Sequence, residues 1–233
     1  MSASPQTFQS IPGFDPRHVP VESTDAGLPP VAPERLSARA LRARLADPPS
    51  WEPENHADRW PFRVDNPRPA AVLVPIVEHA QGATILLTER TSHLSKHAGQ
   101  IAFPGGRRDP EDPSLVDTAL RETEEEIGLP RDRVEVVAQL PEYLTGSGYL
   151  VTPVIGLVRP GFELQLHEGE VAEAFEVPMR FLMDPRHHER RRVVHGEIDR
   201  FFYAMPWQTS RREYFIWGAT AAMLRNLYRL LAA

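Results

Sequence analysis

Residues 97–129, HAGQIAFPGGRRDPEDPSLVDTALRETEEEIGL, decide how the rest of the chain is organised. Asp112 is a good N-cap residue and Pro113 suits the first helical position, whereas Gly128 is a typical helix stop. These signals predict a helix over residues 113–127. Its apolar side chains recur at intervals of three and four residues, so they form one stripe that packs against a core. The stripe consists of Val116, Ala119, Leu120, Thr123 and Ile127.

An acidic face adjoins this stripe, where Glu122, Glu125 and Glu126 lie together while Glu124 points elsewhere. Like charges at this spacing cost roughly a few tenths of a kcal/mol each in an isolated helix, and a bound cation would compensate them. Carboxylate oxygens suit Mg²⁺ or Mn²⁺, with substrate phosphates and waters completing the coordination. The alternative is a solvated acidic face, partly offset by Arg121 pairing with Glu125.

A cluster of helix breakers, Phe103-Pro104-Gly105-Gly106, lies immediately upstream of the acidic helix. Glycines of this kind bring the backbone close to a ligand. We therefore expect the loop and the helix to form one unit that binds phosphate and metal.

These residues resemble the box of the Nudix hydrolases, G-x5-E-x7-R-E-U-x-E-E-x-G-U, in which U is a bulky aliphatic residue. The right half of the box is matched by Arg121, Glu122, Glu125, Glu126, Gly128 and Leu129, with Thr123 at an aliphatic position. The left half departs, because Asp112 replaces the first glutamate and eight residues instead of seven separate it from Arg121. The stretch GGRRDPED from Gly105 looks like the variant of the coenzyme A diphosphatase branch. The role of Asp112 stays open between a helix cap and catalysis.

A second stretch, LLTERTSHLSKHAGQ over residues 86–100, resembles an extra signature of the same branch. Arg90, Lys96 and His97 offer cationic or donor groups beside the acidic helix, where a phosphate-rich substrate would lie. Arg90 is the candidate for the 3′-phosphate of coenzyme A. The alternatives are ordinary surface charge and, for His97, a hydrogen bond that braces the loop.

Two further segments carry candidate residues. Thr145 and Ser147, in a Thr-Gly-Ser-Gly stretch that also looks like a family segment, could contact phosphate or pantetheine, although a turn explains them as well. Glu168, Glu170 and Glu173 lie where Nudix enzymes often supply an additional carboxylate. We choose Glu170 among them, with an acidic loop as the alternative.

The composition limits the classes of partner and site. A formal net charge of -6 argues against a nucleic-acid partner, and the lack of cysteine excludes disulfides and cysteine-ligated metals. The sequence contains neither an apolar run of membrane length nor the features of a secretory signal, so we expect a cytoplasmic protein without a membrane partner.

Residues 1–69 hold 13 of the 24 prolines and predict an extended N-terminal extension with one short helix, at about 34–46, that docks on the main domain. The arginines of this helix should be solvated or meet an acidic partner. Few apolar residues lie in 1–32, so deletion of this segment should leave folding and hydrolysis largely intact.

Residues 70–233 predict a single α/β domain with a mixed β-sheet. The predicted strands cover 71–77, 83–88, 134–139, 151–158, 171–177, 191–194 and 200–204. A closing helix over 217–231 should place Ala221, Leu224, Tyr228 and Leu231 inward. The resemblance implies a Nudix α/β/α sandwich, with the sheet flanked by helices.

The resemblance implies hydrolysis of the diphosphate bond of coenzyme A or its thioesters, giving 4′-phosphopantetheine and adenosine 3′,5′-bisphosphate. Mg²⁺ or Mn²⁺ would bind Glu122 and Glu126, assisted by Glu125 and the Gly105 carbonyl. Arg121 would orient the glutamates, and the loop at Gly105 and Gly106 would lie against the substrate. The general base and a homodimer are left open. The alternatives are ADP-ribose or a dinucleotide as substrate, and a non-catalytic nucleotide sensor, against which the intact glutamates count.

Overall fold

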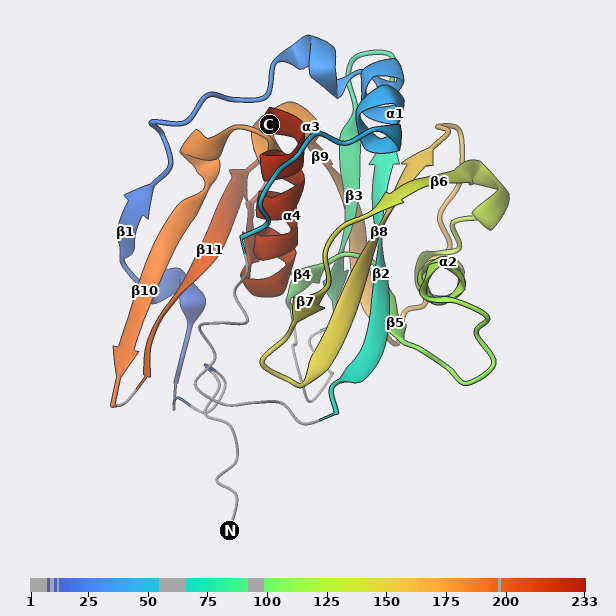
Figure 1. The fold of residues 1–233 in the computed structure, drawn as a ribbon. Coiled ribbons are helices and arrows are strands. Elements are labelled where there is room, and N and C mark those ends of the chain that lie inside the picture. Colours follow the sequence, from blue (N-terminus) through green and yellow to red (C-terminus); the bar gives the residue numbers. More distant parts are fainter. Residues whose placement is uncertain (1–7, 9–10, 12, 55–65, 92–98, 197) are drawn as a thin grey trace.

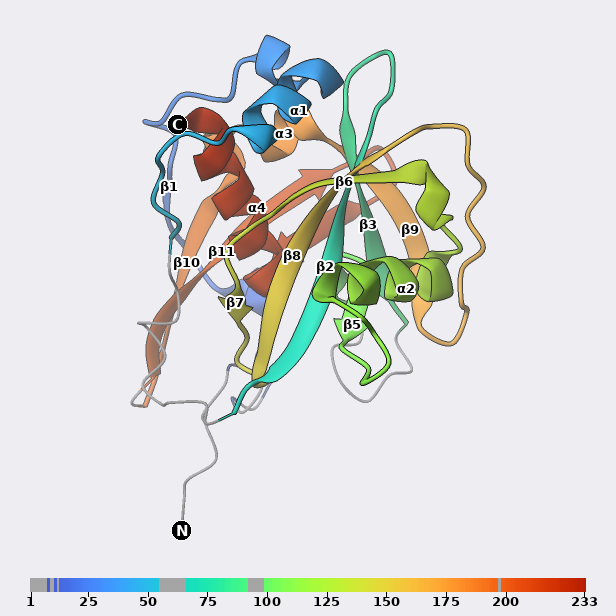
Figure 2. The same cartoon turned by 45° about the vertical axis from the view of Figure 1, so that its right-hand side comes forward.

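The computed structural model describes residues 8, 11, 13–54, 66–91, 99–196 and 198–233. Within these ranges the chain forms two sheets, with helix α2 (Leu115–Ile127) and helix α4 (Gly218–Ala232) on opposite sides of the larger one. The layers therefore run from the smaller sheet through α4 and the larger sheet to α2 (Figures 1 and 2). The predicted α/β/α sandwich is confirmed, and the smaller sheet adds a layer to it.

The larger sheet is mixed, with the order β4-β3-β2-β8-β6, while β5, β7 and β9 pair with β2, β8 and β3. Its central pair, β2 and β8, is parallel and runs in register from Arg68 opposite Tyr149 to Val77 opposite Val158. Its strands are β2 (Arg68–Val77), β3 (Thr84–Arg90), β4 (Ile101–Ala102), β5 (Gly105–Arg107), β6 (Val134–Gln139), β7 (Tyr143–Leu144), β8 (Tyr149–Val158) and β9 (Val171–Pro178). The five strands predicted between residues 71 and 177 are all confirmed.

The central strands are almost continuously apolar because both of their faces are covered. Along β2, Leu73 and Val77 pack in the core beneath α2, whereas Val74 and Ile76 pack in the core beneath α4. The parallel pairing of β2 with β8 requires a crossover connection, and α2 lies in it. The acidic helix is thus fixed to the middle of the sheet.

The smaller sheet is antiparallel, with the order β1-β10-β11-β12. Its strands are β1 (Val21–Thr24), β10 (Glu189–His195), β11 (Ile198–Gln208) and β12 (Glu213–Trp217). The sequence placed the strands at 191–194 and 200–204 in one sheet with the others, which is wrong. The separate sheet forms because β11 is buried on both faces: Tyr203 packs toward α4, and Phe202 packs against the aromatic residues Phe8 and Phe14.

Helix α2 begins two residues later than predicted. Its N-cap is Ser114, whose hydroxyl accepts a hydrogen bond from the Asp117 N–H at 3.2 Å, and not Asp112. Gly128 ends the helix as predicted, in the left-handed conformation with φ 68°. In α4, the four residues predicted to point inward are all buried.

The remaining helical segments are short. The helix predicted near 34–46 is split by Ser37 into a 3₁₀ turn η3 (Pro33–Leu36) and α1 (Ala38–Ala46). The others are η2 (Pro16–His18), α3 (Met179–Leu182), η5 (Arg131–Arg133) and η6 (Pro185–His187). Among the described residues, no helix has the length and apolar character needed to cross a bilayer.

The described part of residues 1–54 packs closely against the rest of the chain. Leu36, Leu41 and Leu45 are buried in the main core. Arg42 forms ion pairs of 2.9 Å with Glu78 and 2.7 Å with Glu135, so this arginine of α1 meets acidic residues of its own chain.

Buried side chains of the smaller sheet and α4 also hold this segment. Arg225, only 2% exposed, forms ion pairs of 2.9 Å with both Asp25 and Glu54. The Tyr228 hydroxyl donates to the Pro29 carbonyl at 2.8 Å. The segment is therefore part of the folded unit.

These contacts reverse the expectation for deletion of residues 1–32. Removing this segment exposes Phe202 and Trp217 and leaves the buried Arg225 without Asp25. Phe8 and Phe14 are partly buried, so the loss of each lowers the free energy of unfolding by less than the about 1.5–3 kcal/mol of a fully buried side chain, and the melting temperature should fall by roughly 5 °C. Thermal unfolding followed by circular dichroism measures this, and a truncated chain that melts with the full-length protein would contradict the packing role.

Candidate active site

The acidic face of α2 meets the glycine loop at the start of β5. The Gly105 N–H donates to Oε2 of Glu126 at 3.1 Å, and Glu126 is only 5% exposed. A β-carbon at Gly106 would lie 2.5 Å from Oε2 of Glu122. At Gly105 it would lie 2.4 Å from the Ala71 carbonyl oxygen, and φ there is 148°. Glycine is needed at position 105, where a side chain would meet the β2 backbone, whereas a side chain at position 106 would displace the Glu122 carboxylate.

Arg121 organises the acidic residues around it. Its Nε and Nη2 atoms donate to the two carboxylate oxygens of Asp112, each at 2.9 Å. The same guanidinium lies 3.0 Å from Oε1 of Glu122 and donates to Glu125 at 2.9 Å. Asp112 is buried and also accepts hydrogen bonds from the Asp109 N–H and the Thr118 hydroxyl, both at 2.9 Å.

These bonds answer the question that the sequence left open about Asp112. The hydrogen bonds from Arg121 hold the pKa of Asp112 well below its usual value, so this carboxylate stays ionised. Asp112 accepts no backbone N–H of the helix, which Ser114 caps, and its double hydrogen bond from Arg121 fixes the guanidinium that in turn pairs with Glu122.

Burial raises the pKa of Glu126 to about 7, and the negative charges of Glu122 and Glu170 act in the same direction. Burial also raises the pKa of Glu122. Two contacts offset part of this effect at Glu126: the Gly105 N–H and Arg90, whose Nη1 lies 3.7 Å from Oε1. The nearby hydrogen-bond donors and positive charges therefore do not fully stabilise the ionised forms of Glu122 and Glu126.

The predicted carboxylates do not all gather in the same way. Glu122 and Glu170 both act electrostatically on Glu126, whereas Glu125 acts on Glu122, pairs with Arg121 and has a side chain that is 60% exposed. Glu124 points away and pairs with Arg131 at 3.0 Å, as its position predicted. Within the ranges that the structure covers, no three acidic or histidine side chains are already grouped as a metal site.

The residues present nevertheless fit a divalent cation. Glu122 and Glu126 are oxygen donors whose raised pKa values reflect burial without enough positive charge. Such hard oxygen ligands suit Mg²⁺ or Mn²⁺, which usually take one or two carboxylates and complete their coordination with water and phosphate. The carbonyl of Gly105 as a ligand stays a prediction, because the contact observed to Glu126 is through its N–H.

The other predicted residues lie around this centre or beyond the described ranges. Arg90 ends β3 beside Glu126, while His97 and Lys96 lie outside the described residues. Thr145 and Ser147 form the turn between β7 and β8, with their hydroxyl oxygens 3.0 Å apart. The Thr145 hydroxyl also accepts from the Tyr149 N–H at 3.0 Å, so part of its capacity stabilises the turn.

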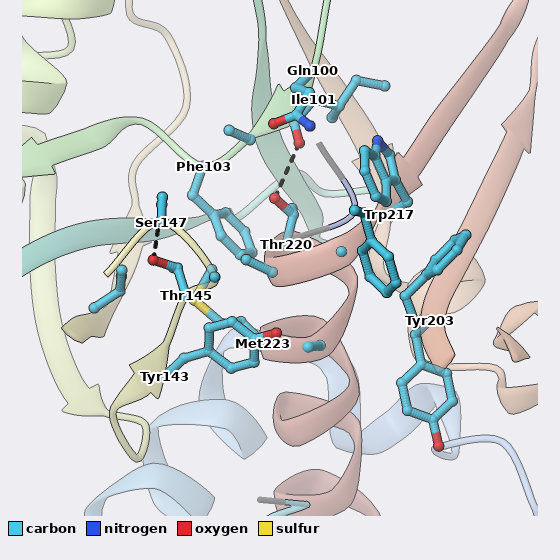
Figure 3. A pocket seen from close by; sticks show the side chains of 18 of the residues that line it. Gln100, Ile101, Phe103, Tyr143, Thr145, Ser147, Tyr203, Trp217, Thr220 and Met223 are labelled. Carbon is cyan, nitrogen blue, oxygen red and sulfur yellow. Dashed lines mark hydrogen bonds between the residues drawn. The ribbon is translucent and has the colours of Figure 1, made fainter. Parts of the chain in front are cut away.

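A cavity of about 550 Å³ opens beside the acidic centre, and Arg90, Gly105, Thr145 and Ser147 all line it. Its remaining walls include the side chains of Phe103, Tyr143, Tyr203, Trp217 and Met223 (Figure 3). Sequence reasoning missed most of these residues because they come from segments far apart in the chain and match no motif. Only Phe103, in the Phe-Pro-Gly-Gly stretch, carried a local signal.

Comparisons with known proteins agree with this geometry. The family model described as "NUDIX domain" matches residues 67–196. The chain is 42% identical over 175 residues to "Uncharacterized Nudix hydrolase NudL" of Yersinia enterocolitica, which covers 71% of this chain and 87% of that protein. It is 44% identical over 163 residues to the protein of the same name from Shigella boydii, with coverages of 70% and 82%.

Two solved structures are similar over about half of the chain. A Nudix hydrolase from M. smegmatis, RenU, has a TM-score of 0.43 at 26% identity, covering 51% of this chain and 75% of that one. An Ap4A hydrolase from C. elegans in a binary complex has a TM-score of 0.42 at 19% identity, with coverages of 49% and 85%.

The raised pKa of Glu126 predicts a pH-dependent stability of the metal-free protein. Because Glu126 holds its proton more tightly in the folded state, its contribution to the free energy of unfolding falls as the pH rises from about 4.5 to about 7. Burial lowers the pKa of His188 to about 4, and its contribution has the opposite sign. The measured quantity is therefore the difference between wild type and Glu126→Gln.

In EDTA, the melting temperature of Glu126→Gln should rise relative to that of wild type as the pH increases from about 5 to about 8. Excess Mg²⁺ should reduce this gain, since it would bind the ionised wild-type carboxylate and not the amide. A difference between the two proteins that does not change with pH would show that Glu126 titrates as it does in the unfolded chain.

Proposed function

The chain belongs to the NUDIX domain family, and from this premise we propose that it hydrolyses the diphosphate bond of coenzyme A or its thioesters with Mg²⁺ or Mn²⁺. The observation that carries the proposal is the buried Glu126 beside Glu122 and the Gly105 N–H, with Arg121 holding the helix side. The resemblance of residues 86–100 and of GGRRDPED to the coenzyme A diphosphatase branch supports the substrate.

The chain's own residues have separable tasks in this reaction. Arg121 keeps Glu122 in place, and the Gly105 N–H keeps one oxygen of Glu126 in place, so both can hold the cation. A divalent ion bound there neutralises diphosphate oxygens and lowers the pKa of a bound water. Glu170, which interacts with both Glu122 and Glu126, is our choice for the carboxylate that accepts a proton from the attacking water.

Arg90 has a different task from the one first expected. Because its guanidinium lies 3.7 Å from Glu126, it is at the reacting centre and suits an oxygen of the diphosphate better than the distant 3′-phosphate. The 3′-phosphate would then lie elsewhere on the surface. Thr145 and Ser147, on the same cavity wall, remain candidates for hydrogen bonds to the substrate.

ADP-ribose or a dinucleotide is the alternative substrate, because the acidic centre recognises a diphosphate and not the groups attached to it. A non-catalytic sensor is the alternative class. The presence of Glu122 and Glu126 in surroundings that raise their pKa values favours an enzyme, since a nucleotide binder has no need of carboxylates whose ionised forms are destabilised.

The test is turnover by the purified protein with Mg²⁺ on coenzyme A, acetyl-coenzyme A, ADP-ribose and NADH. Coenzyme A or its thioester should give the highest kcat/KM, and excess EDTA should abolish hydrolysis. Glu126→Gln should lower kcat by roughly a hundredfold or more. Glu124→Gln, on the same helix but paired with Arg131, is the matched control and should stay near wild type.

Each arm can overturn the proposal. Full turnover in EDTA, or unchanged turnover in Glu126→Gln, would show that the acidic face of α2 takes no part in hydrolysis. A clear preference for ADP-ribose or NADH would select the alternative substrate, and no turnover of any of the four compounds would favour the sensor.

A further inference from the structure

The proposed base, Glu170, lies in the turn that leads into β9, and the segment before this turn is fixed to α2. Between β8 and β9 the chain passes beside α2 (Figure 2). The Gln165 N–H donates to the Ile127 carbonyl at 2.9 Å. The His167 N–H donates to the Glu126 carbonyl, also at 2.9 Å. The last carbonyls of a helix have no partner within it, so these two bonds anchor the turn to the end of the helix that carries Glu126.

The other side of the turn is held by Thr91, which directly follows β3. The Thr91 N–H donates to the Glu170 carbonyl at 3.0 Å, and the Thr91 hydroxyl donates to the Gly169 carbonyl at 3.2 Å. Thr91 is only 7% exposed, so water has little access to take the place of its hydroxyl. Thr91 therefore binds two consecutive carbonyls of the turn that carries Glu170.

An irregularity in the pairing of β3 with β9 brings Thr91 to this position. Arg90 lies opposite Val171, and the register passes over Ala172. Such a β-bulge shifts the residues beyond it by one position and re-aims their side chains. Because of the bulge, Thr91 binds the backbone of Glu170, whereas an unbroken register would place Thr91 opposite Val171. The strand end that carries Arg90 is thus tied directly to the turn that carries the proposed base.

The charges of this segment support the choice of Glu170. Burial is the main cause of the raised pKa of Glu122 and of Glu126, and the negative charge of Glu170 adds to it at both. Glu173 instead forms an ion pair with Arg212. The Glu170 side chain is 46% exposed, so packing holds it only in part and its place depends on the backbone of its turn.

We propose that Thr91 is a positioning residue, whose hydroxyl holds the turn at Gly169 so that the Glu170 carboxylate can accept the proton of the attacking water. In that step the water oxygen bonds to one phosphorus of the diphosphate and its proton passes to Glu170. The bridging P–O bond breaks, and its electron pair leaves with the second phosphate. This inference rests on the proposed function and adds a residue to it.

The experiment measures kcat, KM and Mn²⁺ affinity, with whichever of the four compounds above wild type hydrolyses best. Thr91→Val keeps the branched shape and removes the hydroxyl, whereas Thr91→Ser keeps the hydroxyl. Thr88→Val is the matched control, because Thr88 also lies in β3, is 2% exposed and donates its hydroxyl to the Ala102 carbonyl at 3.2 Å. Each Thr91 variant is also made in the Glu170→Gln background.

Thr91→Val should lower kcat by roughly tenfold, since a small displacement of a catalytic group has effects of this order. KM and Mn²⁺ affinity should stay at the wild-type values, because the cation ligands and Arg90 are held by other bonds. Thr91→Ser should restore most of kcat, and Thr88→Val should keep it. Glu170→Gln alone should lower kcat by roughly a hundredfold or more, and adding Thr91→Val to it should change nothing further.

A wild-type kcat in Thr91→Val would overturn the inference. The same fold loss from Thr91→Val with and without Glu170→Gln would do so too, because Thr91 would then act independently of Glu170. A parallel loss of Mn²⁺ affinity would assign Thr91 to the cation ligands instead. A wild-type kcat in Glu170→Gln would remove the base, and the inference with it, but would leave metal-dependent hydrolysis intact.

Melting temperatures check that each variant folds. If Thr91→Val does not fold, Thr91→Ala replaces it, since alanine removes the hydroxyl without placing a methyl group against the Gly169 carbonyl. No turnover of any of the four compounds by wild type would mark failure of the proposed function itself, and the inference would fall with it.

Discussion

The double hydrogen bond from Arg121 to Asp112 is the interaction on which the acidic centre depends. The negative charges of Glu122, Glu125 and Glu126 repel one another along α2. Arg121 pairs with Glu122 and Glu125, and its two hydrogen bonds to Asp112 fix the guanidinium where it can form both pairs.

The rest of the fold places the acidic centre between the larger sheet and the cavity of about 550 Å³. Helix α2 packs on the larger sheet through Ala119 and Ile127, and β5 pairs with β2 so that the glycine loop reaches Glu126. On the far side, the N-terminal segment packs against β11 through Phe8 and Phe14, and β11 forms a wall of the cavity. Parts outside the family match therefore shape the space beside the shared diphosphate site.

Much of the larger sheet and α2 could be predicted from sequence because apolar runs and helix stripes report burial directly, as they do in 71–77 and at Ile127. In the smaller sheet, the strands at 191–194 and 200–204 were predicted, but not that they form a separate sheet. Strand β1 could not be predicted, because it is exposed at all four positions and carries no apolar pattern. Asp112 and Ser114 are equally good caps, and only the three-dimensional position of Arg121 decides between them. The cavity wall joins distant residues such as Phe103 and Met223, which no local pattern connects.

The central claim, that an arginine fixed by Asp112 holds the carboxylates ready for a cation, is tested most directly by metal binding. Mn²⁺ affinity can be measured by electron paramagnetic resonance for wild type and for Asp112→Asn, with unchanged melting temperatures as the check on folding. The account predicts that Asp112→Asn binds Mn²⁺ about 10–100-fold more weakly, as expected when a residue that orients metal ligands is lost. Equal Mn²⁺ affinities in two equally folded proteins would contradict it.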